Sequence, residues 1–170
     1  MIIAKDKKYL LKSALWLVFD PWKRQRDDRE PDTVDLQNTD VINNYFAEQI
    51  YAYLTQRYAV DHKAIAISYS EISAHDGIHP LFADWNNLNN VEKIDEYMLN
   101  NQLTDLVICG FHHGMCTLYR PYGARYMRFK YNVYLKRDLT CCLTTSDTKN
   151  NIYYLDKNDQ MSRKMFKEII

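Results

Sequence analysis

The fold of this chain can be predicted from one stretch, Leu106-Val107-Ile108-Cys109-Gly110-Phe111-His112-His113-Gly114-Met115-Cys116. It begins with four apolar residues in a row, a pattern typical of a strand that is covered on both faces. Two of the four glycines of the chain, Gly110 and Gly114, follow within it, which indicates a backbone with unusual demands. We therefore expect a buried strand at 105–109 with Cys116 just past its C-terminal end, where open α/β sheets bind their ligands.

Cys116 has two interpretations at this point. If a helix begins there, its first amides would lower the pKa of the thiol and hold an oxyanion, as a nucleophile requires. A single cysteine after a strand is also often a small buried hydrophobic residue without chemistry. The stretch alone leaves both open.

Composition narrows the class of protein. With 170 residues, 46% of them hydrophobic and 26% charged, the chain is typical of one globular domain, residues 1–170. The formal net charge of +0 disfavours nucleic acid or an anionic membrane as a partner. No apolar run is long enough for a membrane span, and the N-terminus lacks the order of a signal peptide. The four cysteines have no disulfide or zinc spacing, so we expect a reducing cytoplasm.

Strands and helices are predicted to alternate along the chain. We expect further strands at 13–20, 64–69 and 131–135, with a short edge strand at 152–155, and helices at 40–58, 91–101 and 159–169. A helix should also follow Cys116 over 115–129, although Pro121 and Gly123 predict a kink there, or a start near Arg120. Residues 22–39 and 139–151 are polar and are expected to be loops. Alternation of this kind predicts an α/β fold with a mostly parallel sheet.

Apolar spacing predicts which side of each helix faces the sheet. For the helix at 40–58 these residues are Ile42, Tyr45, Phe46, Gln49, Ile50, Tyr53 and Leu54. For the helix at 91–101 they are Val91, Ile94, Met98 and Leu99, and for 115–129 they are Leu118, Tyr119, Tyr122, Tyr126 and Phe129.

Asp20 ends the first predicted strand, and Pro21 stops that strand because proline cannot donate to a ladder. A carboxylate at this place is suited to orient or deprotonate a nucleophile. It is equally typical of a turn that begins with Asp before Pro.

The segment 70–90 is expected to be a loop over the same edge of the sheet. His75 and His79 are four residues apart, which on a helix would be a metal pair. Gly77 and Pro80 disfavour a helix there, so we expect no metal, and no motif indicates a cofactor. We interpret His75, His79 and Trp85 as possible lining residues of a pocket, together with His113 and Tyr119.

Taken in order, these residues resemble the isochorismatase-like cysteine hydrolases. The strand at 14–20 resembles the first strand of that family, which ends in its catalytic aspartate, and 94–110 resembles its helix and central strand. The spacing over 111–116 is similar to that between the family's glycine and its nucleophile, and 133–138 resembles its next strand. The resemblance covers roughly residues 13–145.

The resemblance implies a three-layer Rossmann-like α/β domain and a Cys–Asp–Lys triad that hydrolyses an amide or a vinyl ether. It implies that Cys116 is the nucleophile and Asp20 the general base. Phe111–His112 would be the non-proline cis peptide that shapes the oxyanion hole, with the amides of His112 and Cys116 as donors. The family also tends to form homo-oligomers.

This sequence departs from the family at the lysine. The resemblance implies a lysine on a strand end before the helix at 91–101, yet no lysine lies between Lys63 and Lys93. Two functions therefore stay open. The chain either hydrolyses a small-molecule substrate with Cys116 and Asp20, or keeps the fold without hydrolysis and binds a small molecule or a protein.

Overall fold

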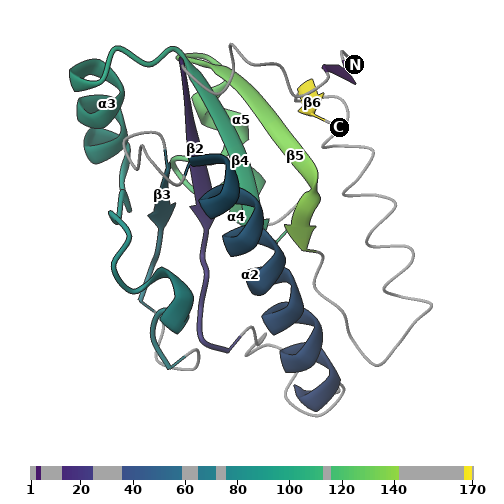
Figure 1. Ribbon diagram of the computed structural model, residues 1–170. Coiled ribbons are helices and arrows are strands. Elements are labelled where there is room, and N and C mark those ends of the chain that lie inside the picture. The colour runs from purple at the N-terminus through teal and green to yellow at the C-terminus, as the bar shows by residue number, and fades with distance from the viewer. Residues whose placement is uncertain are drawn as a thin grey trace.

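The computed structural model describes the backbone of residues 3–4, 13–24, 36–58, 65–71, 76–112, 116–141 and 167–169, and the side chains within 13–24, 43–56, 65–71, 76–112 and 116–141. Figure 1 shows a sheet with helices on both sides. The predicted edge strand at 152–155 lies outside the described residues.

Six strands form a parallel sheet in the order β1-β6-β5-β4-β2-β3. They are β1 (Ile3–Ala4), β2 (Ala14–Phe19), β3 (Ile65–Ser68), β4 (Asp105–Phe111), β5 (Asn132–Cys141) and β6 (Lys167–Ile169). The order changes direction at β2 and β4, the two strands that lead toward Asp20 and Cys116. The predicted α/β fold with a mostly parallel sheet is confirmed.

β2 and β4 are buried along their whole length. Side chains that alternate along β2 enter two different hydrophobic clusters, one on each face of the sheet. Trp16 and Val18 face one cluster, and Leu15 and Leu17 face the other. This is why the two strands are continuous apolar runs and not alternating ones.

Helix α2 (Leu36–Tyr58) covers one face of the sheet, together with the short 3-10 helix η3 (Pro80–Phe82), as Figure 1 shows for α2. Ala47, Ile50 and Leu54 are buried against β2, β3 and β4. The predicted contacts of Tyr45 and Gln49 are wrong, because both side chains are exposed. The buried stripe is rotated and includes Asn43, a polar residue that apolar spacing cannot reveal.

The other face is covered by α3 (Val91–Asn100), α4 (Cys116–Tyr119) and α5 (Ala124–Met127). Instead of the one helix predicted over 115–129 there are two short ones, with Pro121 and Gly123 between them. This break places Tyr122, Ala124 and Met127 in the core. The predicted inward positions of Leu99, Tyr119, Tyr126 and Phe129 are wrong, since all four are exposed.

β5 is longer than predicted and continues through Cys141, so the loop expected at 139–151 begins later. Its register with β4 shifts, because Ile108 pairs with Leu135 whereas Gly110 pairs with Thr140. The extra residues of β5 form a bulge beside the end of β4. The helix expected over 159–169 is wrong at Lys167–Ile169, which form strand β6 beside β5, and its earlier residues lie outside the described ones.

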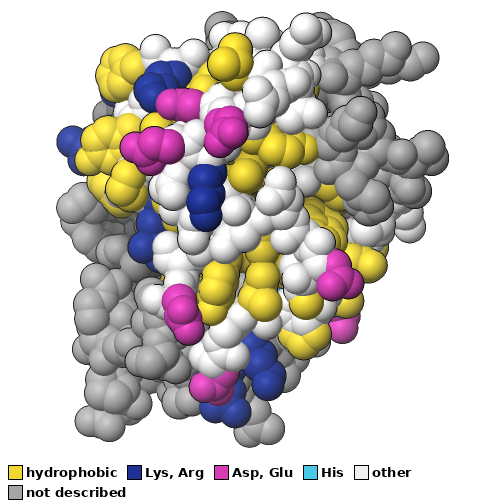
Figure 2. Space-filling model, turned by 90° about the vertical axis from the view of Figure 1, so that its left-hand side faces the viewer, with side chains coloured by type: hydrophobic (Ala, Val, Ile, Leu, Met, Phe, Trp, Pro, Cys, Tyr) yellow, Lys and Arg dark blue, Asp and Glu magenta, His cyan; other side chains and the backbone are white. Residues whose placement is uncertain are grey.

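Within the described ranges, no helix is both long and apolar enough to cross a membrane. On the face seen in Figure 2, acidic and basic side chains are interspersed and small hydrophobic areas lie between them. The described residues of that face therefore form no patch of one charge sign.

Candidate functional site

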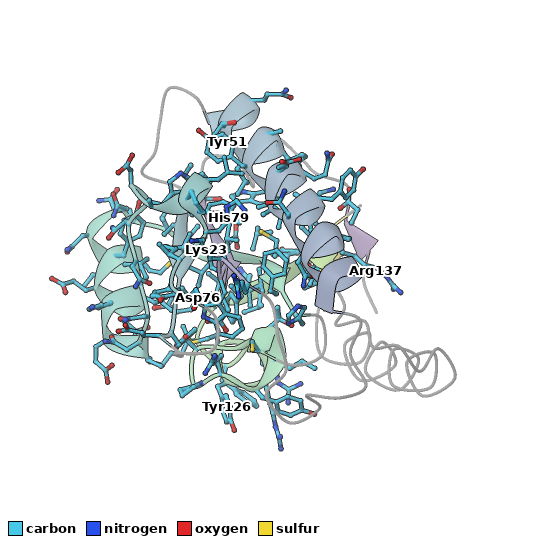
Figure 3. All side chains as sticks on the ribbon, turned by 90° about the horizontal axis from the view of Figure 1, so that it is seen from below. Lys23, Tyr51, Asp76, His79, Tyr126 and Arg137 are labelled. Atoms are coloured by element: carbon cyan, nitrogen blue, oxygen red, sulfur yellow. The ribbon has the colours of Figure 1, made fainter. Side chains whose placement is uncertain are left out.

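Three neighbouring strands end at the same edge of the sheet, because parallel strands share a direction. Asp20 follows β2, Ser70 follows β3, and His112 follows β4. Cys116 begins the helix after β4, as predicted from the opening stretch. Figure 3 looks at the molecule from this end of the strands.

Asp20 is completely buried and has a left-handed backbone, with φ 41°. Few residues other than glycine adopt this region, although aspartate tolerates it better than most. The Asp20 N–H donates to the Ser68 carbonyl at 2.8 Å, which ties the residue to the end of β3. A non-glycine residue held in such a conformation is typical of a functional position.

Gly110 sets the distance between β4 and the residue before Asp20. Its φ is 106°, and a Cβ atom there would lie 2.6 Å from the Phe19 carbonyl oxygen and 2.7 Å from the Phe19 nitrogen. The peptide bond between Phe111 and His112 is cis, as the resemblance implies. The Thr117 hydroxyl donates to the His112 carbonyl at 3.0 Å and so joins this turn to α4.

The Cys116 thiol hydrogen-bonds to the Asp20 carboxylate and also has a hydrogen bond with the His112 backbone. Burial, and next the negative charge of Asp20, raise the pKa of the thiol to about 12. Arg120 and the His112 backbone act in the opposite direction. Cys116 is therefore a protonated thiol at neutral pH, with a carboxylate in place to accept its proton.

Arg120 is the functional residue that sequence reasoning missed. Its Nε and one terminal nitrogen each lie 3.1 Å from Asp20 Oδ2. Its guanidinium also lies over the Trp22 ring, 5.9 Å from the centroid. The signal was present in the sequence, because Arg120 is four residues after Cys116 in a predicted helix, and residues at this spacing share a face.

Both oxygens of Asp20 have partners. Oδ2 accepts from Arg120, and Oδ1 accepts from the Ser70 N–H at 3.2 Å. Burial nevertheless raises the pKa of Asp20 above its usual value, although Arg120, Cys116 and the Ser70 amide all act to lower it. The carboxylate is thus a stronger base than an exposed aspartate.

His79 lies close to this edge, but its ring bonds elsewhere. Nδ1 of the ring accepts from the Leu81 N–H at 3.2 Å, and Nε2 lies 2.8 Å from Asn44 Oδ1, while the His79 backbone N–H donates to the Pro21 carbonyl at 2.7 Å. The ring therefore caps η3 and contacts α2, in agreement with its position in Figure 3. Trp85 packs on Tyr51 and Phe82, with ring centroids 6.0 and 4.9 Å apart.

Tyr119 is partly exposed on α4, where Arg125 lies 5.7 Å from its ring centroid. It lines an open cavity of about 450 Å³ with Val91, Pro121, Tyr126, Met127 and Lys130. Asp20 and Cys116 are not among the lining residues of this cavity. The pocket roles expected of His79, Trp85 and Tyr119 stay predictions, and His75 and His113 lie outside the described residues.

No group of three or more His, Cys, Asp or Glu side chains that could hold a metal ion occurs in the described part of the chain. The contacts among Cys116, Asp20 and Arg120 allow proton transfer between the thiol and the carboxylate beside a positive charge.

Known structures share this arrangement of strands and helices. An isochorismatase-like hydrolase from Alkaliphilus metalliredigens superposes with a TM-score of 0.50 at 10% identity, over 94% of each chain. The chain has the fold of the isochorismatase-like hydrolases. The Escherichia coli YcaC gene product, described as an octameric hydrolase of unknown specificity, superposes with a TM-score of 0.52 at 12% identity over 94% of this chain and 76% of that one.

No protein-family model and no curated protein matches the sequence. The isochorismatase-like fold is thus established by three-dimensional similarity alone. The activity of this chain must be argued from the side chains at the strand ends.

Proposed function

We propose that this protein is a cysteine hydrolase in which Cys116 is the nucleophile and Asp20 the general base, acting on a small amide or vinyl ether. The observation that carries the proposal is the hydrogen bond between the Cys116 thiol and the buried Asp20 carboxylate. The fold shared with isochorismatase-like hydrolases supports it.

For an amide, the reaction has two stages. Cys116 Sγ attacks the carbonyl carbon while its proton moves to Asp20, and the carbonyl oxygen becomes an oxyanion beside the cis peptide at Phe111–His112. Asp20 then gives the proton to the leaving nitrogen as the carbon–nitrogen bond breaks, leaving a thioester. Water, deprotonated by Asp20, attacks the thioester, and the proton returns to the sulfur as the acid leaves.

Two features of the site support this assignment of acid and base. The pKa of the thiol, about 12, keeps the proton on sulfur until substrate arrives. The pKa of Asp20 is raised by burial, so the carboxylate accepts that proton more readily than an exposed one does. Burial thus raises the pKa of both groups. It keeps the proton on the thiol before attack and makes Asp20 a better acceptor for that proton during attack.

The test is turnover of a panel of small primary amides, measured as ammonia release, by the native chain and by Cys116→Ala and Asp20→Asn. We expect both variants to lose at least about 100-fold in kcat, the lower end of what general-base catalysis supplies. Cys109→Ala is the matched control, since Cys109 is a buried thiol of β4 whose sulfur bonds the Leu17 carbonyl at 3.9 Å. Ammonia release that persists in Cys116→Ala would reject the proposal.

A second candidate function is favoured by the same high thiol pKa. A protonated, mostly buried sulfur is also what a cysteine without chemistry has, and a chain of this kind would bind a small molecule or a protein without hydrolysis. Intact-mass spectrometry separates the two. A substrate amide that leaves an acyl group on Cys116 supports the hydrolase, whereas tight binding without an adduct or product supports the binding module.

We further propose that the protein forms a homo-oligomer, which the octameric state of the Escherichia coli protein of the same fold supports. Light scattering coupled to size-exclusion chromatography tests this. A mass near 20.3 kDa at micromolar concentration, the mass of one chain, would contradict it.

A further inference from the structure

Arg120 is held by α4 and by the Asp20 carboxylate. From these contacts we infer that Arg120 is the positioning cation of the site, which keeps Asp20 ionised and directed at the Cys116 sulfur in the place of the missing lysine. The inference rests on the proposed function, but it concerns the charge balance of the site, which can be measured without turnover.

Arg120 contacts the Asp20 carboxylate directly. Two nitrogens of Arg120 contact one oxygen of Asp20, Oδ2, and the Ser70 amide holds the other. Asp20 is completely buried, while a quarter of the Arg120 side chain is exposed. A buried carboxylate without a cation takes up a proton at a higher pH. The guanidinium thus widens the pH range over which Asp20 is charged.

The fold holds Arg120 by two backbone hydrogen bonds and one side-chain contact. The Arg120 backbone N–H donates to the Cys116 carbonyl at 3.2 Å, which closes the turn of α4 between nucleophile and cation. The Trp22 indole lies beside the guanidinium and is itself anchored by its N–H, which donates to the Ser70 carbonyl at 2.7 Å. The Gly123 N–H donates to the Arg120 carbonyl at 2.7 Å.

Other groups that influence this charge balance are tyrosines. Tyr122 bonds Ser70 through its hydroxyl at 3.2 Å and responds to the charges of Asp20, Arg120 and Cys116. Tyr69 responds to Asp20 and to Glu71. The pKa values of both phenols are raised, first by burial, so both stay neutral near pH 7. Near neutral pH the balance therefore depends on Asp20, Arg120 and Cys116.

Asp20 and Arg120 have opposite effects on the pKa of the Cys116 thiol. Removing one or the other should therefore shift the reactivity of the thiol in opposite directions. Asp20 raises the pKa of the thiol and Arg120 lowers it. Arg120→Met removes the attraction for a thiolate, whereas Asp20→Asn removes the repulsion and leaves the cation beside the sulfur. A residue that only held α4 in place would not produce opposite shifts.

The experiment measures the rate of iodoacetamide alkylation at Cys116 between pH 6 and 10, by peptide mass spectrometry. We expect Arg120→Met to lower the rate at pH 8 by about tenfold or more, Asp20→Asn to raise it by about tenfold or more, and Arg120→Lys to stay within about threefold, since one pKa unit changes the thiolate fraction tenfold. Asp20→Asn should gain alkylation while losing hydrolysis.

Arg24→Met is the matched control. Arg24 also contacts a carboxylate, Asp76 Oδ2 at 3.0 Å, but both side chains are about half exposed. The Arg24→Met variant should alkylate at Cys116 with the same pH profile as the native chain. If circular dichroism shows that Arg120→Met does not fold, Arg120→Gln replaces it. The alkylation rates of Arg120→Lys and Asp20→Asn are measured in either case.

Alkylation of Arg120→Met or Arg120→Gln at the rate of the native chain, in folded protein, would overturn the inference. The proposed hydrolase would survive that result if Cys116→Ala still abolished ammonia release. Conversely, a chain that hydrolyses no amide but shows the opposite shifts retains the Arg120 assignment and loses the hydrolase.

Discussion

Gly110 decides how closely β4 approaches the residue that precedes Asp20. A side chain at this position would meet the Phe19 backbone at 2.6 and 2.7 Å, and the Val18 side chain at 3.2 Å. Because the first two atoms belong to the backbone of a central strand, they cannot move aside without displacing Asp20. The position therefore couples stability to the geometry of Asp20.

Gly110→Ala should destabilise the fold by more than the cost of a left-handed backbone alone, which is roughly 1–2 kcal/mol. Gly77→Ala is the control, because Gly77 also has a positive φ of 90° but its nearest neighbour is the Tyr69 hydroxyl at 3.9 Å. Urea unfolding measures both. Equal losses for the two variants would contradict the steric argument.

At the scale of single residues, the positions of Asp20 and Cys116 could be predicted from the sequence better than that of Arg120. Asp20 and Cys116 follow buried strands, so their shared edge could be deduced from strand direction. Arg120 was missed because its partner is 100 residues away in sequence, and its spacing from Cys116 indicates only a shared helix face and not a buried ion pair. Tyr126 and Phe129 were misplaced because the break between α4 and α5 resets the helical spacing.

Among the elements, α3 has a well-defined start. Asn90 has extended backbone angles and its side-chain oxygen accepts from the Lys93 N–H at 2.8 Å, which satisfies one amide of the first turn. Only Ile94 and Met98 of the helix are buried. With so few buried contacts, the cap contributes a large share of the stability of α3.

Asn90→Ala is expected to lower the free energy of unfolding by about 1 kcal/mol, the usual cost of losing such a cap. Asn89→Ala serves as the comparison, since the Asn89 side chain accepts an exposed hydrogen bond from the Lys93 amine at 3.1 Å and does not cap the helix. Thermal and urea unfolding would show the difference. A loss at Asn89 as large as that at Asn90 would rule out capping as the cause.

For the molecule as a whole, His79 joins one helical layer to the edge that carries the site. Burial lowers the pKa of His79, while Glu48 acts to raise it. His79 therefore binds a proton more readily in the unfolded chain than in the folded chain. Its contribution to the free energy of unfolding is complete above pH 6.5, the unfolded pKa, and is lost as the pH falls through that value. Asp20 acts in the opposite direction, because its pKa is raised on folding.

Unfolding in urea at pH 7.5 and pH 5.5 tests the role of His79. The native chain should lose stability on acidification, and His79→Asn should lose less, because asparagine retains an oxygen for the cap but does not titrate. Glu48→Gln should keep the full loss, since His79 remains buried. A His79→Asn chain with the same pH dependence as the native one would show that other groups are responsible.

The layers and the parallel sheet were more predictable than the chain ends. Continuous apolar runs in β2 and β4 indicate burial on both faces, and both strands are buried along their whole length. The extension of β5 and the strand at Lys167–Ile169 depend on pairing with distant residues, which amphipathic spacing does not encode. Met165, Phe166 and Ile169 have a helical spacing, yet Ile169 pairs with Lys136 in the sheet.

Cys116 and Arg120 lie four residues apart, at the start of α4 and directly after its end. A chain that needed a cation from a separate strand would have to preserve two segments and their relative placement as sequences diverge. Here a single short peptide carries both, so the two are inherited, lost or transplanted together. The long connection from β3 to α3 then does not have to supply that charge, and its contribution to Asp20 is the Ser70 amide on Oδ1.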